Sequence, residues 1–189
     1  MWWPRRALVV LVAVAFLAGC GSSEQTPLPP GPAPPQAASL DWVERYPAKG
    51  PALEFSVSRF EVTASGWRAE IGIENDTSTR WRLAETPTTG FGVMLFPTDE
   101  VAEVESRTQD GDLPGLREAR RFAPPLPSDL PPGGSWEGSI SAPGSLAARL
   151  YVRIVFGRLV AMGDAPDGMH TQFSWITDHS YRLETSAAE

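Results

Sequence analysis

The residue types of a hydrolytic relay stand side by side in this chain as Asp178, His179 and Ser180. Neighbouring residues of a strand point to opposite faces, whereas the members of such a relay must converge on one point. The run is therefore not expected to act as a triad. The other histidine, His170, follows a turn, and nothing in the sequence brings it to His179 to bind a metal. One cysteine and two histidines also exclude most Cys/His zinc sites and Cys–His catalytic pairs. We predict no catalytic residue, no metal and no cofactor.

Two polar runs resemble ligand or modification motifs. The run from Asp110 to Gly115 suggests calcium, but an EF-hand fails because Pro114 takes the fifth ligand position and Arg121 the twelfth. A looser calcium site stays an alternative to the solvated acidic turn that we favour. The run Asn75-Asp76-Thr77 matches a glycosylation acceptor, and we interpret it as a turn.

The chain is acidic, with 16 Lys+Arg against 23 Asp+Glu and a net charge of −7. This balance argues against nucleic acid as a partner, because that binding needs dense positive charge. Arg117, Arg120 and Arg121 form the one basic cluster in the sequence. We treat them as a candidate partner surface for an anionic group. The alternative is that they neutralise Glu105 or Glu118.

The first twenty residues have the pattern of an export signal. Arg5 and Arg6 precede an apolar run from Ala7 to Leu17, which is shorter than the ~20 residues of a membrane-spanning helix. The run closes with Leu17-Ala18-Gly19-Cys20, which resembles the lipobox of bacterial lipoproteins. The resemblance implies that residues 1–19 are removed and that Cys20 is acylated, for example by palmitate. The expected location is the outer face of the cell membrane, or the outer membrane if the host has two.

A proline-rich stretch follows the cysteine. Six prolines lie among Gly, Ser, Ala and Gln between Gly21 and Leu40, a composition that favours extended polyproline II at ~3.1 Å per residue, or on the order of 60 Å in all. We expect a flexible tether over residues 20–49, a folded domain over 50–184 and a disordered tail over 185–189. A ligand for a proline-recognition domain is the alternative role of the stretch.

Beyond residue 50 the hydrophobic period is two, which predicts β-strands. Residues 67–74, 136–141 and 150–156 alternate apolar and polar side chains, and a parity slip near Ser58 and Arg59 predicts a bulge. Shorter runs at 80–83, 91–96 and 172–183 bring the count to about seven strands, separated by turn residues. This spacing predicts an all-β, two-sheet sandwich. Residues 98–127 are predicted to contain a short helix or a crossover between the sheets.

Two stretches of the predicted strands resemble a known kind of domain. Residues 71–77 and 130–138 are similar to the strand-and-turn motifs of immunoglobulin-like domains in bacterial lipoproteins, with the layout of intracellular-proteinase-inhibitor-like domains. The resemblance implies an immunoglobulin-like sandwich. The cysteine pair of antibody domains is missing from this chain.

Together these features predict a non-enzymatic, lipid-anchored binding module. Its partners are the membrane, through Cys20, and a protein of the cell envelope. An inhibitor or regulator of extracellular proteases is the alternative. A small-ligand binder or an unrecognised enzyme comes third, and a deep polar pocket holding His179 or His170 beside carboxylates would favour the enzyme.

Overall fold

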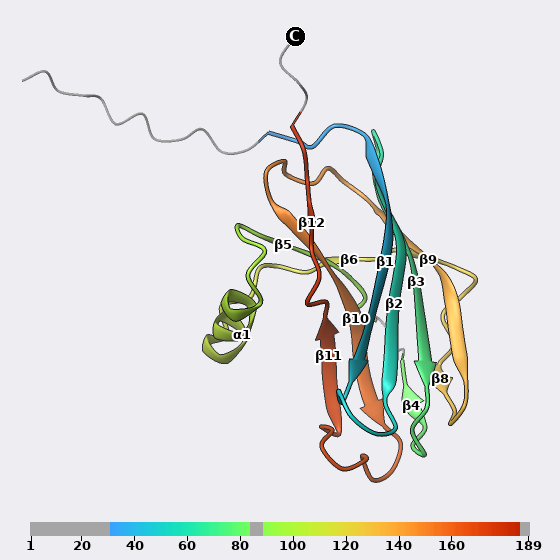
Figure 1. The fold of residues 1–189 in the computed structure, drawn as a ribbon. Coiled ribbons are helices and arrows are strands. Elements are labelled where there is room, and N and C mark those ends of the chain that lie inside the picture. Colours follow the sequence, from blue (N-terminus) through green and yellow to red (C-terminus); the bar gives the residue numbers. More distant parts are fainter. Residues whose placement is uncertain (1–30, 84–88, 186–189) are drawn as a thin grey trace, which may run out of the picture.

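The computed structural model describes residues 31–83 and 89–185 (Figure 1). The predicted signal peptide, Cys20 and most of the predicted tail lie outside the described residues. The described elements, in chain order, are β1 (Gln36–Tyr46), β2 (Leu53–Val62), β3 (Gly66–Asn75), β4 (Trp81–Arg82), β5 (Gly92–Phe96), α1 (Val101–Asp110), β6 (Arg117–Glu118), β7 (Arg121–Ala123), β8 (Asp129–Leu130), β9 (Ser135–Pro143), β10 (Tyr151–Ala161), β11 (Gln172–Ile176) and β12 (Tyr181–Arg182).

The strands form two antiparallel sheets, so the predicted all-β sandwich is confirmed. One sheet, which we call the front sheet, has the order β1-β2-β3-β9-β7. The other, the back sheet, has the order β6-β5-β10-β4-β8, with β11 and β12 also paired to β10. Seven of the described strands are five residues or longer. The remaining strands have two or three residues; β6, β7 and β8 stand at sheet edges, whereas β4 lies between β10 and β8.

The alternating pattern of the sequence decides which face of each strand is buried. In β3, Trp67, Ala69, Ile71 and Ile73 are buried, and the strand pairs with β9 from Gly66 opposite Pro143 to Glu74 opposite Ser135. The predicted bulge is also confirmed, because the pairing of β2 with β3 shifts between Val57 and Arg59. Aromatic rings fill the space between the sheets, with Phe55 of β2 centred 4.9 Å from Phe156 of β10.

The prediction that the tether extends to residue 49 is wrong. Residues 36–46 form β1, which pairs with β2 from Gln36 opposite Val62 to Tyr46 opposite Leu53, with a register shift between Ser39 and Trp42. Leu40, Trp42 and Tyr46 pack against the core. Every second residue of β1 is more buried than its neighbours, but the prolines before this strand obscured the alternation.

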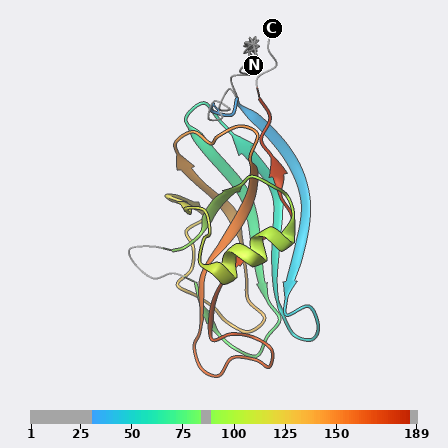
Figure 2. The same cartoon turned by 90° about the vertical axis from the view of Figure 1, so that its left-hand side faces the viewer.

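The uncertain region at 98–127 contains a helix and a crossover. Helix α1 ends at Gly111, which takes the left-handed conformation at φ 70° and closes the last turn with bonds to two carbonyls. The helix lies outside the back sheet, in front of it in Figure 2. The chain then passes from β6, paired with β5, to β7, paired with β9. This segment therefore connects the two sheets, as the sequence suggested.

Both ends of the described chain lie at the same end of the sandwich, at the top of Figure 1. The Ala33 amide donates to the carbonyl of Leu146 (2.7 Å), and the Glu184 amide donates to Oε1 of Gln36 (3.1 Å). We call this the terminal end. The opposite, distal end carries the connections at 47–52, 76–80 and 162–171. No helix within the described residues is long and apolar enough to cross a bilayer.

Candidate functional site

The densest group of chemically capable side chains lies where the edges of the two sheets meet. Glu44 of β1 is only 7% exposed. One carboxylate oxygen accepts hydrogen bonds from Trp175 Nε1 (2.6 Å) and the Asp178 amide (3.0 Å). The other accepts from the His179 amide (3.0 Å) and lies 2.7 Å from His179 Nδ1. Because a carboxylate only accepts, Nδ1 carries the proton in this contact. Glu44 thereby joins the front sheet to the connection between β11 and β12.

Arg153 of β10 holds the same connection from the outer side of the back sheet. Its side chain is fully buried, and it donates to the carbonyls of Thr177 (2.7 Å) and Asp178 and, ahead of α1, of Asp99 (2.6 Å). The guanidinium also lies 5.7 Å from the ring centre of Phe96. Burial lowers the pKa of Arg153, and the charges of nearby carboxylates oppose that shift. Arg153 therefore links three segments that are distant in the sequence.

The connection held between these two side chains runs from Thr177 to Ser180. Thr177 Oγ1 accepts from the Ile154 amide (3.1 Å) and donates to the His179 carbonyl (2.9 Å). The Asp178 side chain faces outward. Partial burial raises the pKa of Asp178, and the charge of Glu44 adds to this effect, while Arg153 and His179 oppose it. We call Glu44, Arg153 and residues 177–180 the edge junction.

The edge junction contains half of a catalytic relay. A histidine whose Nδ1 is held by a buried carboxylate has the orientation of a general base. However, no hydroxyl of the described residues hydrogen-bonds to Nε2 of His179. The carboxylate partner is also Glu44, from another strand, instead of the adjacent Asp178. The His179 ring stacks on Trp42, with centres 5.6 Å apart and planes at 18°. The contacts that the described residues make here join β1 to residues 175–179.

Sequence reasoning missed both central residues of the junction. Glu44 lies within the segment that the sequence predicts to be tether. Arg153 gives no signal in the sequence, because an arginine in an alternating strand is ordinarily exposed, whereas here it is fully buried. His179 lies in the connection after β11, and its stacking partner Trp42 comes from β1, which the sequence assigns to the tether.

The predicted partner surface divides between the two sheets. Arg117 lies in β6 of the back sheet and Arg121 in β7 of the front sheet, with Arg120 between them. All three are exposed, and none forms an ion pair with a described residue. The carboxylate of Glu118, which they were expected to neutralise in the alternative view, accepts the amides of Thr89 and Gly90 instead.

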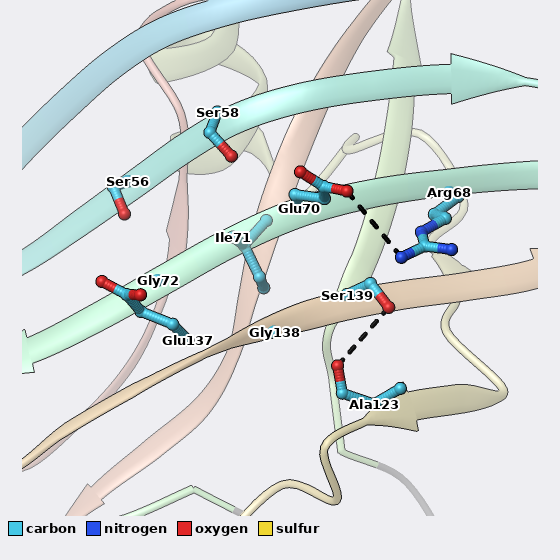
Figure 3. A pocket seen from close by; sticks show the side chains of 10 residues that line it. All are labelled: Ser56, Ser58, Arg68, Glu70, Ile71, Gly72, Ala123, Glu137, Gly138 and Ser139. Atoms are coloured by element: carbon cyan, nitrogen blue, oxygen red, sulfur yellow. Dashed lines mark hydrogen bonds and ion pairs between the residues drawn. The ribbon is translucent and has the colours of Figure 1, made fainter.

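A broad polar hollow of about 440 Å³ lies on the outer face of the front sheet (Figure 3). It forms at Gly72, where a Cβ atom would lie 2.6 Å from the Ser56 hydroxyl. Glu70, Glu137 and Arg68 line it, and Arg68 lies 3.8 Å from Glu70. Neither histidine borders this hollow, so it is not the pocket that would favour an enzyme.

The other candidate motifs have structural roles. Asp112 pairs with Arg107 at the end of α1 (3.1 Å), and no group of three metal-ligating side chains is assembled within the described residues. Asn75 is fully buried. Its amide donates to the carbonyls of Thr79, Leu130 and Pro131, and its oxygen accepts from Thr77. The run that matches a glycosylation acceptor is therefore a turn held by buried hydrogen bonds.

Comparisons with known proteins give no relative. The chain matches no family model, and no curated protein or solved structure matches it.

Proposed function

We propose that this protein is a lipid-anchored, non-enzymatic binding module of the cell envelope. One observation carries the proposal: both ends of the described chain leave the sandwich at its terminal end. An acylated Cys20 upstream would hold that end toward the bilayer. The connections at the distal end would then face away from the membrane, where a partner can reach them.

The length of the chain before the domain supports a close attachment. Only eleven residue steps separate Cys20 from Gly31, where the described chain begins. Even a fully extended chain of that length reaches at most about 40 Å. This is shorter than the ~60 Å reach of a tether that extends to residue 40. The domain would thus stay within about 40 Å of the membrane.

Three observations at the distal end support a protein contact there. A hollow of about 510 Å³ there is lined by residues 78–80, Pro132 and residues 162–164. Met162 is 45% exposed at this hollow. Thr79 Oγ1 donates to the Asp164 carbonyl (2.9 Å), so two of the distal connections hold each other in place. An exposed, flexible methionine on a fixed frame suits an adaptable apolar contact with a protein.

The proposal is tested by crosslinking in cells. A photo-reactive residue replaces Met162 in one form of the full chain and Val43, which is 55% exposed on β1, in a matched control. We expect a specific envelope protein to crosslink from position 162 and not from position 43. The same crosslink should be lost when Cys20→Ala removes the anchor.

Two results would contradict the proposal. An unmodified Cys20 in the exported protein, measured by mass spectrometry, would remove the lipid anchor. Equal crosslinking from positions 162 and 43, or none from either, would remove the distal partner. The inhibitor alternative would then be tested by mixing the protein with proteases of the same envelope.

A further inference from the structure

A second groove lies at the terminal end and has a different character. It encloses about 490 Å³ beside the turn between β2 and β3 and the end of β9. Three arginines, Arg68, Arg120 and Arg121, line it together with the hydroxyl residues Thr63, Ser65 and Ser141. We call this feature the arginine groove.

The pairing of the strands places two of the arginines in one row. Arg68 of β3 is opposite Ser141 of β9, and Ser141 is opposite Arg121 of β7. Neighbouring strands lie ≈ 4.7–4.9 Å apart, so the Cα atoms of Arg68 and Arg121 lie about 10 Å apart, with both side chains on the same face and Ser141 between them. Arg120 is adjacent, with its amide bound to the Ser141 carbonyl (2.8 Å).

These positive charges are poorly compensated within the domain. Arg120 and Arg121 are exposed and make no ion pair with any residue in 31–83 or 89–185. Arg68 makes only a long contact of 3.8 Å with Glu70. Arg68 is partly compensated by Glu70 and lies opposite Glu61 of β2, whereas Arg120 and Arg121 have no paired carboxylate among the described residues. In a chain of net charge −7, these two cations beside Arg68 are complementary to an external anion. Planar guanidinium forks flanked by hydroxyl donors suit phosphate oxygens in particular.

The arginine groove lies at the end of the domain that the proposed anchor would hold against the membrane, whose lipids carry phosphate. The Ser65 carbonyl accepts from the Gly144 amide (3.0 Å), and the same β9–β10 connection accepts the Ala33 amide at Leu146. The groove therefore opens beside the point where the chain enters the domain. If Cys20 is acylated, that end faces the bilayer at the short reach estimated above.

We propose that the arginine groove binds the phosphate headgroups of anionic phospholipids in the membrane that holds Cys20. This inference rests on the proposed anchor for its direction, because the anchor brings the groove to the lipid surface. Binding at the groove would fix the domain against the membrane by its terminal end. The distal end would then be held outward, instead of moving freely on a tether.

The experiment uses the mature chain from residue 20 with Cys20→Ser, so that no acyl chain contributes to binding. The described core extends from Ala33 to Leu183, so this chain contains all of it. Binding to sedimented vesicles is measured with phosphatidylcholine alone and with phosphatidylcholine in which a third of the lipid is phosphatidylglycerol. We expect binding only to the anionic vesicles, and a steep loss of binding as salt is raised.

Paired variants separate the groove from simple charge. Arg120→Gln with Arg121→Gln removes two groove cations, and we expect vesicle partitioning to fall roughly 25-fold, at about fivefold for each arginine near an anionic surface. Arg45→Gln with Arg117→Gln removes the same charge from exposed positions outside the groove. This control pair is expected to change vesicle partitioning by less than about twofold, because salt screens charges that lie away from the lipid surface.

Three results would overturn the inference. One is equal binding to both kinds of vesicle, and another is an equal loss in the two paired variants. The third is saturable binding of inorganic phosphate that prevents vesicle binding, which would make the groove a site for a free anion. Because the measurement omits the acyl chain, it stands apart from the mass of Cys20, which tests the proposed anchor itself.

Discussion

Both oxygens of the buried Glu44 carboxylate are hydrogen-bonded to neighbouring residues. Four donors converge on its two oxygens, and all four belong to the single stretch from Trp175 to His179. A buried carboxylate costs stability unless it is hydrogen-bonded in this way. The arrangement therefore makes Glu44 the residue on which the β11–β12 connection depends.

We predict that Glu44→Ala lowers the free energy of unfolding by about 2–4 kcal/mol, because buried donors lose their acceptor. Glu44→Gln keeps one acceptor oxygen and should cost less, about 1–2 kcal/mol. Urea unfolding followed by fluorescence measures both. Glu54→Gln is the matched control, since Glu54 makes only a long ion pair with Arg45 (3.9 Å), and it should change stability by less than about 0.5 kcal/mol.

Asp178 gives a prediction that depends on pH. Its pKa is raised in the folded state, so ionisation of its carboxyl opposes folding. The stabilisation from the protonated form is complete below the unfolded pKa and is lost as pH rises through the raised folded pKa. Asp178→Asn should therefore be the more stable protein at pH 7, by no more than about 0.5 kcal/mol because solvent screens this side chain.

The advantage of Asp178→Asn should shrink as the pH falls toward the ordinary range of an aspartate, and thermal unfolding across a pH series checks this. Asp164→Asn, at an exposed position on a distal connection, is the matched substitution with which the series is compared. An Asp178→Asn protein that loses stability at neutral pH would contradict the assigned cause of the shift.

At this scale the sequence indicates residue types better than partners. It suggests that Asp178, His179 and Ser180 lie in one strand, whereas they lie in the connection between β11 and β12, and the carboxylate at His179 Nδ1 belongs to Glu44. It does not indicate that Glu44 lies against His179, since the two are 135 positions apart and meet only when the two sheets pack.

Among the elements, α1 is attached to the domain by few contacts. Only Val104 of the helix is buried, and the Arg153 bond to the Asp99 carbonyl holds the chain just before it. We predict that Arg153→Met increases amide hydrogen exchange in α1 and in residues 177–180 by about tenfold or more, equivalent to one lost charged hydrogen bond of about 1.5–3 kcal/mol. Exchange in β2 and β3 should stay unchanged, and faster exchange there would mean that the effect is global.

The turn after β3 depends on Asn75. Its side chain donates hydrogen bonds to three carbonyls and accepts one from the Thr77 hydroxyl. These bonds join the turn to the segment before β9. Asn75→Ala should lower the free energy of unfolding by about 2–4 kcal/mol. Ser78→Ala, at an exposed position of the same turn, is the control and should lie within about 0.5 kcal/mol of the parent protein in urea unfolding.

The elements that the sequence predicts well are those with clean alternation. Strands β3 and β9 have one apolar and one polar face, so the period alone identifies them. Strand β1 is not predicted from the sequence, because prolines precede it and the buried Glu44 occupies a position where an apolar residue is expected. Helix α1 is difficult to place because its pattern has two valines among charged residues, and its position depends on Arg153.

For the whole molecule, one core joins the two sheets. Phe156 of the back sheet is fully buried and contacts Phe55 of the front sheet. We predict that Phe156→Ala costs about 3–5 kcal/mol. Fluorescence and circular dichroism should follow one coincident transition, because both sheets lose their common core together. If the alanine variant does not fold, Phe156→Leu provides a milder test at about 1–3 kcal/mol. Separate transitions would contradict a shared core.

The bond between the Glu184 amide and Gln36 brings the two ends of the folded chain within reach of a short covalent link. The domain is thus suited to circular permutation, in which the native ends are joined and the chain is reopened in the connection at 162–171. A permutant of this kind would be attached to its lipid through the distal end. The terminal end would then face away from the bilayer, so that partner binding by the two forms would depend on orientation alone and not on the residues present.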